Sequence, residues 1–173
     1  ALADIDAVVA RVRRSRSYRM ASSALILWGP IVAAGYVLTH VMPKRAALVW
    51  IGCHTLGVAA TLWLARRERR DYGRPYDLRL VWATVIVAAF GLIWTVGLAR
   101  LGPRELSAFW PTLFMMGYVL AGLWLGRLLV AIGCGITALT LAGYVFAGPW
   151  FDLYMAVVNG GGLLACGLAM RRS

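Results

Sequence analysis

The chain alternates between long apolar windows and short charged segments. None of its 18 basic and 7 acidic residues lies inside the windows. About 20 apolar residues in a helix, at a rise of about 1.5 Å each, cross a hydrocarbon core about 30 Å thick. A spanning strand would need only about 10 residues with period-two alternation, which the windows lack. The pattern predicts an all-α membrane protein with six transmembrane helices, at about 21–42, 46–65, 80–99, 106–126, 128–146 and 153–170.

Basic residues lie mostly in alternate connections between these windows. The N-terminal segment, the connections at 66–79 and at Arg127, and the C-terminal tail hold 14 of the 18 basic residues. The other three connections hold the remaining 4. Loops rich in Lys and Arg stay on the cytoplasmic side of a membrane, so both termini are predicted to be cytoplasmic.

Composition agrees with a membrane location. The chain is 61% hydrophobic and 14% charged, whereas a soluble domain is about 45–50% apolar and about 25% charged. A net charge of +11 would suggest nucleic acid in a soluble protein, but here the charge mostly records topology and no base-reading motif accompanies it. We expect the partners to be the lipid bilayer with its anionic headgroups, and no nucleic acid.

A basic segment, residues 1–20, precedes the transmembrane domain at 21–172. Apolar residues recur at three- and four-residue steps over 2–20, which predicts a cytoplasmic amphipathic helix. Such a helix either lies in the headgroup layer or docks onto a cytoplasmic partner. The residues expected to contact a partner or lipid headgroups, here and in the loop at 66–79, are Arg11, Arg13, Arg14, Arg66, Arg67, Arg69 and Arg70.

Three outward-facing turns each carry one proline: Pro43, Pro103 and Pro149. Each proline is followed, 22 to 24 residues later, by an arginine that closes a similar apolar string. The spacing favours three helical hairpins, which are either true repeats about an axis along the membrane normal or a consequence of membrane thickness alone.

Small residues gather in the last three windows. Gly122 and Gly126 have the small-xxx-small spacing that lets helix backbones approach each other. Three glycines follow the most polar residue found in the middle of a window: Asn159, Gly160, Gly161 and Gly162. Such a run indicates either close packing with an interhelical hydrogen bond or a helix break that faces a ligand.

The two histidines, His40 and His54, raise the hypothesis of haem ligation. Both axial ligands of one haem need matching depths. His40 lies only about 3 Å from the end of its helix, whereas His54 lies about 12 Å along the next one. The mismatch argues against haem, and we expect no cofactor. His54 is expected to hydrogen-bond between helices.

The sequence lacks the clusters of residues that a metal site or a catalytic site needs. Cys134 and Cys166 are expected toward the inner side and Cys53 toward the outer side, so they form no cluster of ligands and no metal is expected. Glu105 and Asp152 are expected to form interfacial ion pairs with Arg100 and Arg104. Since no nucleophile and base lie in an evident arrangement, we expect no enzyme.

Function is therefore open between two classes. The windows contain no charged residue, which counts against an ion-coupled pump. The leading hypothesis is a non-catalytic integral membrane protein, an accessory or regulatory subunit of a larger membrane assembly. The alternative is a small transporter or channel for an uncharged, apolar or zwitterionic solute.

The C-terminal third carries a resemblance. Its strings Gly122-Leu-Trp-Leu-Gly-Arg127, the run from Gly143 to Ala156, Gly160 to Leu164 and Arg171-Arg172 resemble a recurring group of uncharacterised multi-pass inner-membrane proteins of proteobacteria. The resemblance implies the same six-helix layout and a bacterial inner membrane. The group brings no activity, so it assigns no functional residues.

Overall fold

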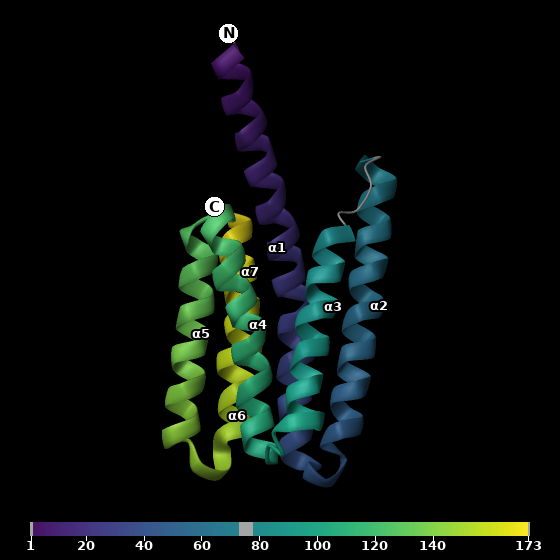
Figure 1. The fold of residues 1–173 in the computed structure, drawn as a ribbon, viewed down its shortest axis with the longest axis vertical. Coiled ribbons are helices and arrows are strands. Elements are labelled where there is room, and N and C mark those ends of the chain that lie inside the picture. Colours follow the sequence, from purple (N-terminus) through teal and green to yellow (C-terminus); the bar gives the residue numbers. More distant parts are fainter. Residues whose placement is uncertain (1, 73–77, 173) are drawn as a thin grey trace.

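The protein is a bundle of helices that run alternately up and down (Figure 1). A computed structural model describes the backbone of residues 2–72 and 78–172, and the side chains of 21–67, 82–124 and 126–171. The elements are α1 (Leu2–Val41), η1 (Pro43–Arg45), α2 (Ala46–Tyr72), α3 (Leu78–Leu92), η2 (Ile93–Leu98), α4 (Pro103–Leu125), α5 (Arg127–Phe146), η3 (Gly148–Trp150), α6 (Phe151–Met155), η4 (Ala156–Gly161) and α7 (Gly162–Arg172).

Five helical segments in the described chain are long and apolar enough to cross a membrane. They cover Ala21–Val41, Pro43–Arg67, Pro103–Trp124, Arg127–Phe146 and Gly148–Arg171. The third predicted window is helical as well, but its described apolar part, Trp82–Leu98, is shorter than these five. Five of the six predicted spans are thus confirmed by length and composition, and the other is confirmed as a helix.

Helix α1 runs without a break through 40 residues. The sequence predicted two separate helices here, at 2–20 and 21–42, because the charge pattern changes between them. At about 1.5 Å per residue the single helix is about 60 Å long, and its first half extends beyond the rest of the bundle (Figure 1). Pro30 lies inside this helix and Pro111 inside α4, and neither ends its helix.

Helices α4 and α5 make the most extensive contact in the described part of the chain. Each contributes a glycine to it. A Cβ on Gly122 would lie 2.6 Å from the backbone nitrogen of Val130, and one on Gly133 would lie 2.8 Å from the Met115 carbonyl oxygen. The turn between the helices is a single residue, Gly126, whose φ of 144° disfavours any side chain. The predicted division of 106–126 from 128–146 is therefore correct.

Helix α1 packs closely against the last membrane segment, α6–η4–α7. A Cβ on Gly29 would lie 2.9 Å from the Gly160 carbonyl oxygen, and one on Gly167 would lie 2.9 Å from the Cβ of Leu25. The first and last spanning segments are therefore neighbours in the bundle (Figure 1).

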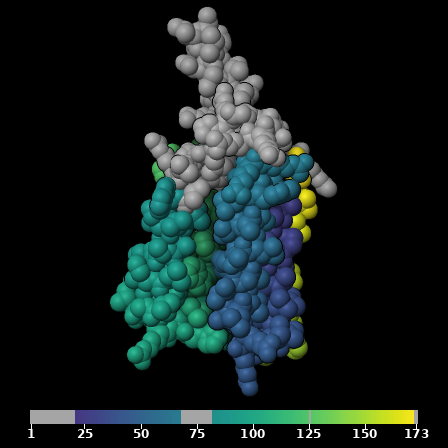
Figure 2. All heavy atoms as spheres, turned by 90° about the vertical axis from the view of Figure 1, so that its right-hand side faces the viewer, coloured from purple at the N-terminus to yellow at the C-terminus, as the bar shows by residue number. Residues whose placement is uncertain are grey.

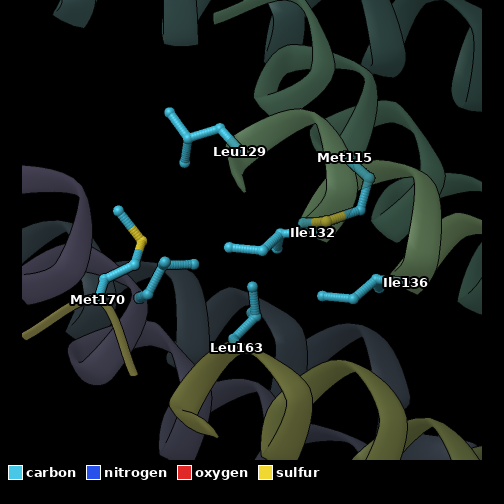
Figure 3. Close-up of a cluster of buried hydrophobic side chains, with 7 residues drawn as sticks. Met115, Leu129, Ile132, Ile136, Leu163 and Met170 are labelled. Atoms are coloured by element: carbon cyan, nitrogen blue, oxygen red, sulfur yellow. The ribbon is translucent and has the colours of Figure 1, made fainter. Parts of the chain in front are cut away.

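The main apolar core lies where these two helix pairs meet. Side chains from α4 and α5 point toward side chains from α1 and α7 (Figure 3). The buried members are Leu25, Met115, Leu129, Ile132, Ile136, Leu163 and Met170. A second cluster, Tyr36, Phe151, Met155 and Ala156, joins α1 to α6 and η4.

Helices α2 and α3 stand at the edge of this core. Helix α2 packs mainly on α1, and α3 makes only a small contact with α4. Of the most apolar stretch in Pro43–Arg67 only 6% is buried, against 39% in Gly148–Arg171. Viewed from the side, α2 and α3 flank a hollow through which α4 is visible (Figure 2).

The hairpin arrangement stays a prediction. The most extensive contacts in the described chain pair α4 with α5 and α1 with α7, across the predicted hairpins rather than within them. The glycines explain the difference, because they let backbones approach only where they occur on facing helices. The internal duplication stays a prediction.

Candidate functional site

Four polar side chains are buried in the described spans: Ser22, Thr39, Thr140 and Asn159. The Ser22 hydroxyl donates to the Gly167 carbonyl over 2.7 Å and ties α1 to α7. The two threonines donate to carbonyls of their own helices, four residues earlier. Only Asn159 has a buried atom without a hydrogen-bond partner in the described chain, its Oδ1.

Asn159 lies in a small polar cluster between α1, α4 and η4. The Tyr36 hydroxyl donates to the Ser107 carbonyl oxygen over 2.8 Å, and the Asn159 side chain interacts with the same hydroxyl. Trp50 packs edge-on against the Tyr36 ring, with 4.9 Å between centroids. The cluster links three membrane segments and leaves one acceptor, Asn159 Oδ1, available.

The three glycines after Asn159 have different surroundings. A Cβ on Gly160 would lie 2.6 Å from the Cα of Ala33 in α1, whereas Gly161 has open space and Gly162 has only Ile136 nearby, at 3.7 Å. Residues Ala156–Gly161 form a π-helical segment, a loosened geometry that often accompanies functional sites. Gly160 thus allows close packing, as the packing hypothesis requires. The segment around it is also loosened, as the hypothesis of a helix break requires.

His54 is exposed on α2, within the membrane-spanning stretch. Its Nδ1 lies 2.7 Å from the Trp50 carbonyl oxygen, one turn earlier. This bond stays within α2, and among the residues whose side chains are described no hydrogen bond from His54 to another helix is seen. The ring lies edge-on to Trp28, at 6.0 Å between centroids, and tilted against Trp50, at 5.8 Å.

A shallow, open apolar groove lies beside this histidine. It is lined by His54, Thr55, Val58, Ala59 and Leu62, all from α2. Figure 2 shows the face of the molecule that α2 and α3 form. The sequence did not reveal the groove, although His54 and Thr55 next to small apolar residues at 58 and 59 were a readable sign of a polar spot on an apolar face.

His40 lies elsewhere, stacked on Trp150 with 5.6 Å between ring centroids. The two histidines thus have separate aromatic neighbours, and the structure does not bring them together. Among the described residues, no group of three or more His, Cys, Asp or Glu side chains is placed to hold a metal. Cys53, Cys134 and Cys166 carry free thiols.

Arg104, near the start of α4, contacts aromatic residues of α5 and α6. Arg104 donates to the Tyr144 carbonyl oxygen over 2.7 Å, and its guanidinium lies over the rings of Tyr144 and Phe151, at 5.2 and 5.5 Å. Glu105 accepts a hydrogen bond from the Tyr144 hydroxyl over 3.3 Å. Arg104 therefore faces α5 and α6, and the ion pairs of Glu105 and Asp152 with Arg100 and Arg104 stay a prediction.

The basic residues expected to meet a partner are described only in part. Arg66 and Arg67 are exposed, and the Arg67 guanidinium lies 5.7 Å from the Trp63 ring centroid. The side chains of Arg11, Arg13, Arg14, Arg69 and Arg70 lie outside the described residues.

The long apolar helices define a multi-pass helical membrane protein. No protein-family model matches the chain, and comparisons with curated proteins and with solved structures gave no match. The resemblance of the C-terminal third to proteobacterial inner-membrane proteins stays a prediction.

Proposed function

We propose that the chain is a non-catalytic subunit of a larger assembly in a bacterial inner membrane, and that α5 is the helix that meets its partner. The partner is another membrane protein subunit or a second copy of the chain. One observation carries the proposal: the outer face of α5 has the small-residue pattern of a helix contact and is uncovered.

Inside the fold, small residues accompany close approaches between helices. Gly29 and Gly160 serve this role between α1 and η4, as Gly122 and Gly133 do between α4 and α5. Lipid tails are as apolar as leucine side chains, so helices associate in a membrane largely through such close packing.

The outer face of α5 repeats this pattern, and no helix covers it in the described part of the chain. Ala131, Cys134, Gly135 and Ala138 are all exposed and lie within about two turns. A Cβ on Gly135 would have no heavy atom within 4 Å. The buried residues of α5, such as Ile132, occupy its other side. A second helix could therefore approach this face as closely as α4 approaches Gly133.

Extraction in a mild detergent, followed by native mass spectrometry, tests the proposal. We expect the wild-type chain to carry a partner or to form an oligomer. Gly135→Leu should release it, because a leucine would hold the helices apart. Gly52→Leu is the matched control, since Gly52 also faces open space but lies on α2. A wild-type chain that is always a lone monomer contradicts the proposal.

We also propose that both termini are cytoplasmic. The distribution of 14 against 4 basic residues supports this orientation, and the two ends of the chain lie at the same end of the bundle (Figure 1). A reporter fused to the C-terminus should be active only in the cytoplasm, and periplasmic activity would overturn the orientation.

A transporter for an uncharged or zwitterionic solute is the second candidate. Its support is the buried, unpartnered Oδ1 of Asn159 in a π-helical segment, because interrupted helices form the binding sites of many transporters. Solute flux into proteoliposomes tests it. Flux that Asn159→Leu abolishes would support transport, and the absence of flux for a panel of such solutes would count against it.

A further inference from the structure

His54 is an ionisable side chain within a membrane span, exposed at the rim of the contact between α2 and α1. Such residues are rare, and most face the bundle interior or a water-filled cavity. His54 instead is exposed on α2, a helix that is covered on one side by α1. Because an exposed polar ring is costly in hydrocarbon, its position calls for a partner from outside the chain.

The tautomer of the ring defines what that partner must offer. A carbonyl oxygen can only accept, so the 2.7 Å contact with the Trp50 carbonyl requires a hydrogen on Nδ1. The neutral ring then presents Nε2 as a bare acceptor. Histidines that bind a ligand through one nitrogen are commonly held in this way by a carbonyl at the other.

The neighbouring Thr55 adds a second acceptor. Its hydroxyl hydrogen is used on the Ile51 carbonyl oxygen, over 2.8 Å, which leaves the oxygen lone pairs for a ligand. Backbone N–H groups here are used within the helix. The polar atoms of the groove therefore accept hydrogen bonds and donate none, so a fitting ligand must carry hydroxyl or N–H donors.

The depth of His54 and the residues that line the groove restrict the class of ligand further. His54 lies about 12 Å from the start of α2, which is too deep for a phospholipid headgroup. The rest of the groove is apolar, from Val58, Ala59 and Leu62, and it is open and shallow, so a ligand would lie along the helix with its apolar part against these side chains. Trp28 and Trp50 flank the histidine ring, so the polar end adjoins aromatic surface.

We propose that the groove on α2 binds the reduced, hydroxylated ring of a lipid-soluble hydroquinone. One ring hydroxyl donates to His54 Nε2, and the hydrocarbon tail lies along Val58, Ala59 and Leu62. The oxidised quinone offers only acceptors and is disfavoured in the same place. The site does not involve α5, so it stands apart from the proposed partner contact.

Binding of a decyl hydroquinone to the full chain in lipid nanodiscs, measured anaerobically by calorimetry against empty nanodiscs, tests the proposal. We expect saturable binding and a Kd at least about tenfold lower than those of the quinone and of the hydroquinone dimethyl ether, the size of one lost hydrogen bond. Decanol, which has a hydroxyl but no ring, should bind more weakly. Equal binding of decanol would overturn ring recognition in favour of a lipid hydroxyl.

Variants locate the site. His54→Leu and Thr55→Val should each raise the Kd for the hydroquinone, and Val58→Phe should do so by filling the groove. All three positions line an open face, so the fold should persist, which thermal melting checks. His40→Leu is the matched control and should bind normally, because His40 stacks on Trp150 instead. Unsaturable partitioning, or equal loss in the His40 variant, would overturn the proposal.

Discussion

At the scale of single residues, the close helix contacts depend on the absence of one carbon atom. Gly160 and Gly161 are adjacent and chemically identical, yet only Gly160 faces the α1 backbone at Ala33. The sequence alone predicted that this run matters but could not say which glycine does, because helix rotation about its own axis is decided by the neighbours.

Gly160→Ala and Gly161→Ala should therefore differ in stability. The first adds a Cβ that would lie 2.6 Å from the Cα of Ala33, and overpacking of this kind costs about 1–3 kcal/mol. The second adds a Cβ to open space and should leave stability unchanged or slightly higher. Thermal melting in detergent measures both, and equal melting temperatures would contradict the observed contact.

Ser22→Ala should destabilise the α1–α7 contact. It removes the buried bond to the Gly167 carbonyl, and the expected loss is about 0.5–1.5 kcal/mol in the free energy of unfolding. The neighbouring Ser23→Ala is the control, because Ser23 is only half-buried. Denaturant titration in mixed micelles would show the difference, and identical midpoints would argue against the bond.

At the scale of helices, the apolar windows predicted lengths well and neighbours poorly. Most window boundaries lie within about three residues of a helix end, because hydrocarbon thickness sets the length of a span. Helix α2 continues to Tyr72, past the predicted end at 65, since helices do not stop where charge begins. Its last residue precedes Gly73, and glycine often follows the end of a helix. Which helices become neighbours depends on the shapes of their side chains, and the pattern of apolar residues did not predict it.

The side chain of His54 shows the same limit at the candidate site. Counting residues along the predicted helix gave the depth of His54. Its exposure could not be predicted, because it depends on which side of α2 packs against α1. An orphan acceptor such as Asn159 Oδ1 is likewise a property of three helices together. The sequence identified both residues as notable and could assign neither a partner.

Arg104 joins α4 to α5 and α6, and Arg104→Lys should not replace it. The guanidinium donates to the Tyr144 carbonyl while its plane lies over two rings, which a lysine ammonium cannot reproduce. A loss of about 1 kcal/mol would lower the melting temperature by about 2–4 °C. Arg100→Lys serves as the control and should melt like wild type. A fully stable Arg104→Lys would contradict the stacked contact.

At the scale of the whole molecule, stability is unevenly distributed. The four segments around the core share buried side chains, whereas α2 and α3 present most of theirs outward. Regions with few buried contacts open locally at lower free energy than the core does.

Hydrogen exchange in detergent should follow this division. Amides of α2 and α3 should exchange before those of α5 and α7, because fewer packed side chains oppose their opening. Mass spectrometry of peptides from the same sample compares the helices directly, so each serves as a reference for the others. Slower exchange in α3 than in α7 would contradict the observed packing.

The contact between α1 and the final membrane segment also has a consequence in time. A ribosome makes α1 before α7, so the serine and glycine contacts of α1 have no counterpart until all the helices between them have been synthesised. Helices α1 and α2 are therefore in the bilayer before the segment that packs against α1 has been made. A chain truncated before Asn159 would retain every earlier helix and still lack the surface on which the first one closes.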